Sequence, residues 1–242
     1  MYFALDDTWE KISIDNAIRG NDYYCASCGN RLIMKCGDVV QHHFAHERNN
    51  NCDPWYSDNK GPWHRAMQAL FRDEFQEVLI RSDNDPSEYH IADVCIKRNN
   101  KANIIFEFQQ SQISKSDFEE RNDFYIHNGR NTVNGRLANN KLYWIFSFAD
   151  KKTIYEYYKS RERREMAYRS GTRQYTWLYR VKQFTDFDFQ NTENPIILFY
   201  LGDDHYIRID YAYNGGKYFG GKVVKQSTFI RWAIHQSKSK TE

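Results

Sequence analysis

Apolar and polar positions follow two different periods in the middle of the chain. From Gly61-Pro62 onward, apolar side chains recur at helical spacing, which predicts a helix that gives way to a strand near Val78. Residues 89–97 and 104–109 instead alternate between apolar and polar and are rich in β-forming side chains. They predict two strands joined by the polar turn KRNNKAN.

A helix and another strand follow this predicted hairpin. Ser114 and Asp117 make the aspartate form of a helix-capping sequence, and Gly129 suits the end of the helix that they begin. The continuous apolar run KLYWIFSF at residues 141–148 is typical of a strand buried on both faces. The predicted order over residues 62–148 is therefore helix, strand, strand, strand, helix, strand.

The two ends of the chain have other patterns. Residues 1–60 are polar, hold four of the five cysteines and finish in a stretch rich in turn-forming residues. A charged helical pattern covers residues 151–169, and apolar runs at 195–200, 205–213 and 217–224 predict strands. We therefore expect three regions: an N-terminal module at 1–60, a mixed α/β core at 61–150 and a C-terminal helical and β-rich extension at 151–242.

Each strand of the predicted hairpin carries an acid in its middle, Asp93 in the first and Glu107 in the second. Side chains alternate along a strand, so Glu107 shares its face with Gln109. If the two acids lie side by side, a divalent cation such as Mg²⁺ relieves their repulsion and can activate water against a phosphate. Loss of either acid should then stop cleavage without harming the fold. Judged by alternation alone, both acids can equally face solvent.

The element order resembles the core of the PD-(D/E)xK nucleases, with Asp93 as the acid of the second strand and Glu107-Phe-Gln109 in place of E-x-K. A longer string resembles the competence protein CoiA-like family: Glu107, Gln109, Ser111, Ile113 and Ser114, followed by Phe118, Arg121 and Tyr125. The similarity extends to Trp63-His64 and to the N-terminal cysteines and histidines. It implies a restriction-endonuclease-like fold and a metal-dependent nuclease that binds Mg²⁺ or Mn²⁺ through Asp93 and Glu107.

Gln109 departs from the lysine of the superfamily. A glutamine amide can orient a water molecule by hydrogen bonds, but it brings no charge to activate it. The resemblance implies that glutamine is usual in the CoiA-like branch, which leaves more of the activation to the metal. The same residue supports an alternative, in which the protein is a non-catalytic DNA-binding or recombination accessory protein on a nuclease-like core.

Further residues are candidates for supporting roles. His64 can reach the carboxylates, a metal, a phosphate or a water, or it can pack against the tryptophan-containing linker. Arg121 and Tyr125 share a helix face, so they can contact the scissile phosphate or brace the acids. They can equally be a surface arginine that covers a core tyrosine. Ser111 joins the candidates through its place in the CoiA-like string.

The N-terminal cysteines and histidines predict a zinc site. Cys25 and Cys28 form a C-x-x-C pair, and His43 and His46 have a spacing that brings both rings to one side of a helical turn. The CoiA-like family has a similar pair of motifs. These four residues are the expected ligands, with His42 and Cys52 in reserve, and four protein ligands make the zinc structural. A rival interpretation, as in HNH-type nucleases, gives the chemistry to His42 or His43, but it lacks a downstream helix with Asn or His ligands.

Composition and charge limit the kinds of molecule that this protein is expected to bind. The net charge is +2, so a nucleic acid must be bound by a local patch. No apolar run reaches about 18 residues and no signal peptide is apparent, which predicts no membrane partner and a cytoplasmic location. We expect nucleic acid, DNA in the first place, as the partner. RNA as substrate, a second copy or a partner protein, and a role in competence, defence or repair all stay open.

Overall fold

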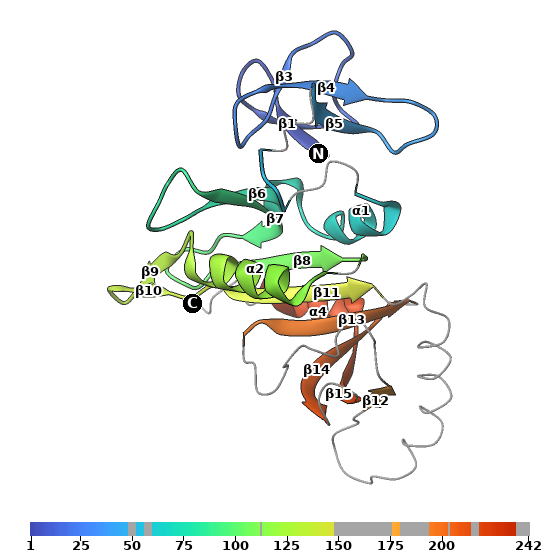
Figure 1. The fold of residues 1–242 in the computed structure, drawn as a ribbon, viewed down its shortest axis with the longest axis vertical. Helices are drawn as coiled ribbons and strands as arrows, with labels where there is room; N and C mark the ends of the chain where they lie inside the picture. The colour runs from blue at the N-terminus through green and yellow to red at the C-terminus, as the bar shows by residue number, and fades with distance from the viewer. Residues whose placement is uncertain are drawn as a thin grey trace. The chain divides into compact units, whose positions relative to one another are not determined.

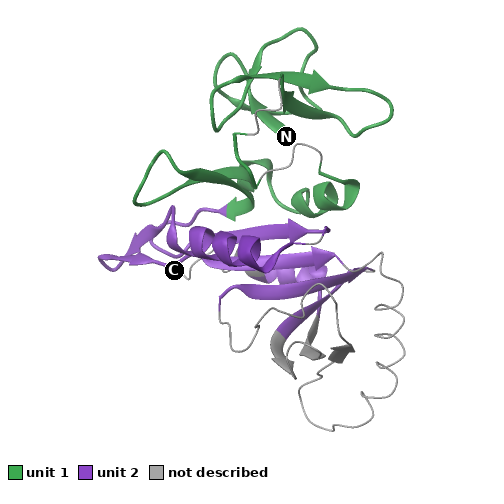
Figure 2. Ribbon diagram, in the orientation of Figure 1, with its two compact units in different colours: residues 1–95 green, residues 96–242 purple. Residues whose placement is uncertain are grey.

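The computed structural model describes residues 1–47, 52–55, 60–111, 113–147, 176–179, 194–202, 204–213 and 218–235 (Figure 1). The chain divides into two compact units, residues 1–95 and 96–242 (Figure 2). The division falls at the end of the strand that carries Asp93, so Asp93 belongs to the first unit and Glu107 to the second.

The first unit begins with a five-stranded antiparallel sheet in the order β2-β1-β3-β4-β5. Its strands are β1 (Phe3–Leu5), β2 (Lys11–Ser13), β3 (Tyr23–Tyr24), β4 (Arg31–Lys35) and β5 (His43–His46). Buried residues of this sheet, among them Phe44 and Leu32, share one hydrophobic cluster with Cys25 and Ile91. The N-terminal sheet therefore has a small core of its own, which later residues of the same unit help to close.

The rest of the first unit is α1 (Pro62–Gln68), the short 3₁₀ turn η1 (Asp73–Phe75), β6 (Gln76–Arg81) and β7 (Tyr89–Ile96). Strands β6 and β7 form an antiparallel hairpin. Pro62 begins α1 as predicted, but the predicted continuation of the helix toward Val78 is wrong. The helix ends at Gln68, and Phe71 lies in the turn that follows. Phe71 is apolar because it is buried in the core there, so its spacing from the helix residues only resembles a helical repeat.

One side chain ties the N-terminal sheet to this second part of the unit. The Glu77 carboxylate of β6 accepts hydrogen bonds from the backbone N–H groups of Tyr2 and Phe3, both at 3.1 Å. Arg65 of α1 lies 3.4 Å from the same carboxylate and stacks its guanidinium over the Tyr2 ring. Charged groups, and not apolar packing alone, therefore hold these elements together.

The second unit contains a mixed sheet in the order β12-β15-β14-β13-β11-β8. Its elements are β8 (Ile104–Gln109), α2 (Lys115–His127), β9 (Asn131–Val133), β10 (Arg136–Ala138), β11 (Lys141–Ser147), β12 (Thr176–Tyr179), β13 (Ile196–Gly202), β14 (His205–Tyr213), β15 (Tyr218–Lys225) and α4 (Gln226–His235). Strands β8, β11 and β13 are parallel, and the strands beyond β13 are antiparallel. The predicted mixed α/β fold with a β-rich C-terminal part is confirmed.

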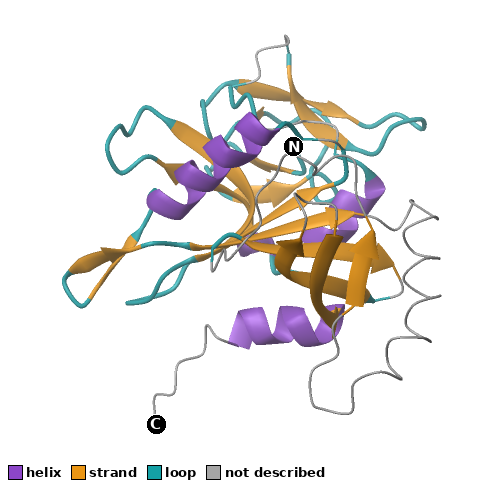
Figure 3. Ribbon diagram, turned by 60° about the horizontal axis from the view of Figure 1, so that its bottom comes forward, coloured by secondary structure: helices purple, strands orange, loops and turns teal. Residues whose placement is uncertain are grey.

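Helices α2 and α4 lie on opposite faces of this sheet (Figure 3). Phe118 of α2 contacts the rings of Trp144 and Phe146, whereas Phe229 of α4 contacts Tyr143 and Phe106. Because neighbours along a strand point to opposite faces, these contacts assign the two faces of β11 to the two helices.

Local sequence signals explain most of the boundaries in the second unit. The Ser114 hydroxyl accepts a hydrogen bond from the Asp117 N–H at 3.0 Å, which confirms the predicted helix cap. The hairpin β9–β10 was not predicted, although its turn residues Asn134 and Gly135 both have positive φ, as such hairpins require. The helix predicted at 151–169 lies outside the described residues. No helix in the described ranges is long and apolar enough to cross a bilayer.

Candidate active site and metal centre

Four side chains of the first unit converge on one point: Cys25, Cys28, His46 and Cys52. Their ligand atoms all lie within 4.8 Å of one another. The Sγ atoms of Cys25 and Cys52 are 3.6 Å apart, and Sγ of Cys28 is 3.4 Å from Nε2 of His46. Three thiols and an imidazole at these separations fit the tetrahedral set of a structural zinc ion.

The turn from Cys25 to Cys28 is shaped by its backbone. The N–H of Gly29 donates to the Cys25 carbonyl at 2.9 Å, and Gly29 has a φ of 69°, which favours glycine. The N–H of Ser27 points at the Cys25 sulfur, 3.4 Å away. This turn brings both sulfurs to the same side, so the sequence C-x-x-C-G is sufficient to build half of the centre.

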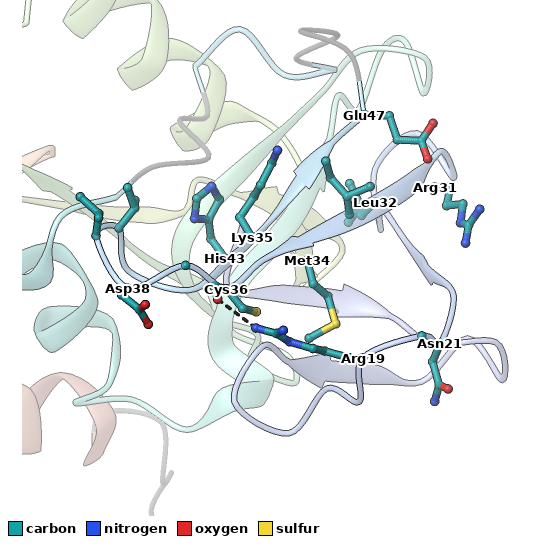
Figure 4. A pocket seen from close by; sticks show the side chains of 15 residues that line it. Arg19, Asn21, Arg31, Leu32, Met34, Lys35, Cys36, Asp38, His43 and Glu47 are labelled. Carbon is teal, nitrogen blue, oxygen red and sulfur yellow. Dashed lines mark hydrogen bonds between the residues drawn. The ribbon is translucent and has the colours of Figure 1, made fainter.

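The structure corrects the predicted ligand set at His43. The prediction assumed a helical turn, but residues 43–46 form strand β5, in which positions three apart point to opposite faces. The His43 ring instead bonds to the Gln41 carbonyl at 2.8 Å and lies beside Lys35 in the lining of an open pocket of about 960 Å³ (Figure 4). Cys52, a reserve candidate, takes its place, whereas His42 is exposed on the surface.

The thiols of the centre influence one another. The hydrogen bond from Cys52 lowers the pKa of Cys25 to about 5, while the same bond raises the pKa of Cys52 above its ordinary value. Burial, together with the nearby Cys52 and Cys28 thiols, raises the pKa of the Tyr89 hydroxyl to about 12. A lowered thiol pKa favours the thiolate, which is the form in which cysteine binds a metal ion.

Asp93 is buried in β7, and three polar side chains converge on it. Lys60 donates a hydrogen bond to Oδ1 of Asp93, and Nε2 of His64 lies 3.0 Å from the same oxygen. Gln68 of α1 donates to the Asp93 backbone carbonyl at 3.1 Å. Lys60 and His64 thus face the carboxylate itself, whereas Gln68 binds the backbone that carries it.

Charge explains how this buried acid stays ionised. Burial by itself raises the pKa of Asp93, but the charges and hydrogen bonds of His64 and Lys60 outweigh it and hold the pKa well below the usual range. Burial lowers the pKa of His64, whereas the neighbouring Asp93 carboxylate opposes this shift. Lys60 is the cation in hydrogen-bond contact with Asp93.

Sequence reasoning missed Lys60. It belongs to a polar stretch between two elements, and nothing in its local pattern distinguishes it from a solvated lysine. Only the approach of residues 60 and 93 in space reveals the contact, so a local motif could not have found it. Yet its side chain is only 7% exposed, like that of Asp93.

Glu107 faces α2 in the second unit. It sits opposite Trp144 in the β8–β11 register and is 4% exposed. Arg121 of α2 places Nη1 3.8 Å from the Glu107 carboxylate. Helix α2 thus covers the strand face that carries Glu107 and directs a basic side chain at the acid. Glu107 is therefore not a strand acid that faces solvent.

The other candidates from the CoiA-like string also lie in the second unit. The Gln109 amide N–H₂ donates to the backbone carbonyl and to the hydroxyl of Ser111, both at 3.0 Å. Tyr125 is completely buried, so it belongs to the core of the unit in the way that a structural tyrosine does. Arg121 directs its guanidinium at Glu107, and its predicted roles at the phosphate or in bracing the acids stay predictions.

Two family models match this chain. The N-terminal domain of competence protein CoiA matches residues 6–54, and the nuclease-like domain of competence protein CoiA matches residues 86–198. The first match contains all four residues of the cysteine–histidine centre, and the second contains both Asp93 and Glu107. Fold and sites together define a protein in which an N-terminal cysteine–histidine module is followed along the chain by a nuclease-like domain. The chain belongs to the CoiA-like competence protein family. Searches among curated proteins and among solved structures gave no match.

Proposed function

We propose that this protein is a metal-dependent nuclease that hydrolyses phosphodiester bonds in DNA in the cytoplasm, with Asp93 and Glu107 as the ligands of Mg²⁺ or Mn²⁺. The observation that carries the proposal is the environment of Asp93, a buried carboxylate in the range matched by the nuclease-like domain, which Lys60 and His64 both contact. Burying a charged group costs free energy. A buried carboxylate that is supplied with hydrogen-bond donors therefore indicates that its negative charge has a function.

The donor set suits the proposed cation. Mg²⁺ and Mn²⁺ prefer oxygen ligands, and Asp93 and Glu107 supply carboxylates from two strands of the matched nuclease-like range. When bound, such a cation lowers the pKa of a bound water and neutralises charge that builds up on a phosphate.

The remaining residues have complementary tasks in this proposal. Because Ser111 engages the amide N–H₂ of Gln109, the amide oxygen is directed to accept a hydrogen bond and can orient a water. Arg121 places a positive charge 3.8 Å from the Glu107 carboxylate. Lys60 brings to Asp93 the positive charge that a glutamine at position 109 lacks, and His64, whose pKa is lowered by burial, is placed to exchange a proton.

A second candidate function has an observation in its favour. The Lys60 ammonium group already contacts the Asp93 carboxylate, so a cation supplied by the chain itself neutralises this acid. In a non-catalytic accessory protein, this pair would be a permanent structural ion pair, and DNA binding would need no divalent metal. The two functions therefore differ in whether a divalent cation binds near Asp93.

The test is a cleavage assay with Mg²⁺ and with Mn²⁺ on single-stranded, double-stranded and circular DNA, with an RNA arm. We expect metal-dependent cleavage by the natural chain and a loss of roughly 10³-fold or more in Asp93→Asn and Glu107→Gln. The matched control is Glu119→Gln, an exposed acid on α2 whose loss should leave cleavage unchanged. Full activity in either site variant, or DNA binding with no cleavage on any substrate, would favour the accessory protein.

A further inference from the structure

Strand β7 is contacted along its first half by the segment that leaves the cysteine–histidine centre. Cys52, one of the four residues of the centre, packs against the hydrophobic cluster that contains Ile91 of this strand. Asp53, the next residue of the segment, bonds to His90 and Ile91. Further along, Lys60 bonds to Asp93. The contacts of Asp53 and Lys60 therefore follow the order of their partners along β7.

Asp53 accepts hydrogen bonds through both of its carboxylate oxygens. Its Oδ1 lies 2.8 Å from Nδ1 of His90, and its Oδ2 accepts the backbone N–H of Ile91 at 2.7 Å. The N–H of Trp55 donates to Oδ1 at 3.0 Å, and the Trp55 ring stacks on the His90 ring with centroids 3.3 Å apart. Asp53 is only 2% exposed. Both carboxylate oxygens are therefore occupied in fixing the strand two residues before Asp93.

The position of Asp53 in the chain links this contact to the metal centre. A cation held by Cys52 also fixes the backbone of the adjacent residue, and thereby the direction of the Asp53 carboxylate. Without a cation, Cys52 is no longer joined through a shared ion to the other three residues of the centre, and the Cys52 end of the segment is held less firmly. The Ile91 N–H, which points to Asp53 and lies in an otherwise buried strand, would then lose its acceptor.

We infer that Asp53 is a positioning residue that couples zinc binding at Cys25, Cys28, His46 and Cys52 to the placement of β7 and therefore of Asp93. The part of this inference that concerns Asp93 as a metal ligand rests on the proposed nuclease function. The coupling between the zinc centre and β7 is independent of it, because every contact involved lies within the first unit.

Amide hydrogen exchange on the full-length protein tests the coupling without reference to activity. In the zinc-loaded natural chain, the Ile91 amide should be protected, and removal of zinc by a chelator should accelerate its exchange by at least about tenfold. Asp53→Ala should show the same acceleration while it still contains zinc, because none of its four ligands is changed. Asp53→Asn keeps an acceptor oxygen for the Ile91 N–H and should be intermediate, which also covers the case in which the alanine variant does not fold.

A double comparison separates coupling from a purely structural role of Asp53. If Asp53 transmits the effect of zinc, chelation of Asp53→Ala should add little to the exchange that the substitution already causes. Independent effects would multiply and would overturn the inference, as would an Ile91 amide whose exchange does not respond to zinc. The control is Asp85→Ala, an exposed aspartate in the β6–β7 connection that bonds to Ser87 and should not alter the zinc response.

Calorimetric titration with Mn²⁺ extends the test to Asp93. Zinc removal and Asp53→Ala should each weaken Mn²⁺ binding by about tenfold or more, in the range of groups that orient metal ligands. If Mn²⁺ does not bind the natural chain while Ile91 exchange still responds to zinc, the proposed nuclease function fails and the coupling stands. If Mn²⁺ binds well in every sample regardless of zinc, the coupling to Asp93 fails and the nuclease proposal stands.

Discussion

The two units hold their buried acids in different ways. In the first unit, Asp93 has two nitrogen partners on one oxygen, Lys60 in hydrogen-bond contact and His64 at 3.0 Å. In the second, Glu107 faces Arg121 at 3.8 Å, beyond hydrogen-bond distance, under a helix that packs by aromatic rings. The first acid is therefore neutralised at close range by the chain, whereas the second is held in an aromatic core with a more distant counter-charge.

This difference extends to how each unit is stabilised. Charged and polar groups join the parts of the first unit, as at Glu77 with the backbone of β1 and Asp53 with β7. The second unit buries large rings on both faces of β11, with Trp144 and Tyr143 fully inside. Directional polar contacts depend on pH, ions and exact partners, whereas apolar packing depends mostly on volume. The first unit should thus be the more sensitive to changes of metal and charge.

The largest expected effect is on stability at Asp93. The sequence alone predicts that losing either acid spares the fold, whereas the structure leads us to expect a loss of stability for Asp93, because its removal leaves the buried Lys60 without this carboxylate. Asp93→Ala should lower the free energy of unfolding by about 3–5 kcal/mol. Urea unfolding measures it, and Asp93→Leu with Lys60→Met should recover much of the loss. A loss below about 1 kcal/mol would contradict this prediction, because it would mean that the Lys60–Asp93 ion pair contributes no more than a surface ion pair does.

The second prediction separates the zinc ligands. Cys52→Ser should weaken zinc binding by roughly 100-fold or more, because it removes one of four ligands from a centre whose binding energy supports folding. His43→Gln, in the same region but outside the centre, should leave zinc affinity unchanged. Competition with a chromogenic chelator gives both values. Hydrogen exchange should show opening in the first unit only, and equal opening in both units would contradict the contrast between them.

The third prediction concerns Gln109. If its amide orients the attacking water, Gln109→Ala should slow cleavage by roughly 10²-fold at saturating metal without changing stability. Ser111→Ala, which removes one of the two acceptors of the amide, should have a smaller effect in the same direction. Single-turnover rates provide the comparison. Unchanged rates in Gln109→Ala would remove this residue from the site, whatever the result for Glu107.

The smallest effect is a dependence of stability on pH. Because the pKa of Asp93 is depressed in the folded state, its stabilising contribution is complete above its unfolded value of about 3.9 and is lost as the pH falls through the lower folded value. The advantage of the natural chain over Asp93→Asn in urea unfolding should therefore shrink only below about pH 4. Because the pKa of His64 is depressed in the folded state, this histidine makes the fold lose stability as the pH falls below its unfolded value of about 6.5. Repeating the titration in a His64→Gln background removes this contribution and leaves that of Asp93.

Local patterns predicted what local physics determines. The cap at Ser114, the strands that carry both acids and the C-x-x-C turn all follow from short-range rules, and the structure contains them. The choice of Cys52 over His43 could not be made in this way, because histidine spacing indicates a shared side only once the segment is known to be a helix. The Lys60 contact depends on tertiary folding, for which the sequence alone offers no periodic signal.

The hydrogen bond between the Trp144 indole and the Asn122 side chain, 2.7 Å long, has a consequence for how this sequence can vary in length. It fixes the rotation of α2 about its own axis, and the neighbouring residue is Arg121. Each residue inserted between the cap at Ser114 and Arg121 would turn the later part of the helix by about 100°. Insertions in this part of α2 should therefore be selected against as the sequence diverges, whereas the exposed turn at Asn134 and Gly135 can accept them. The spacing of residues along α2 is thus a constraint separate from their identity.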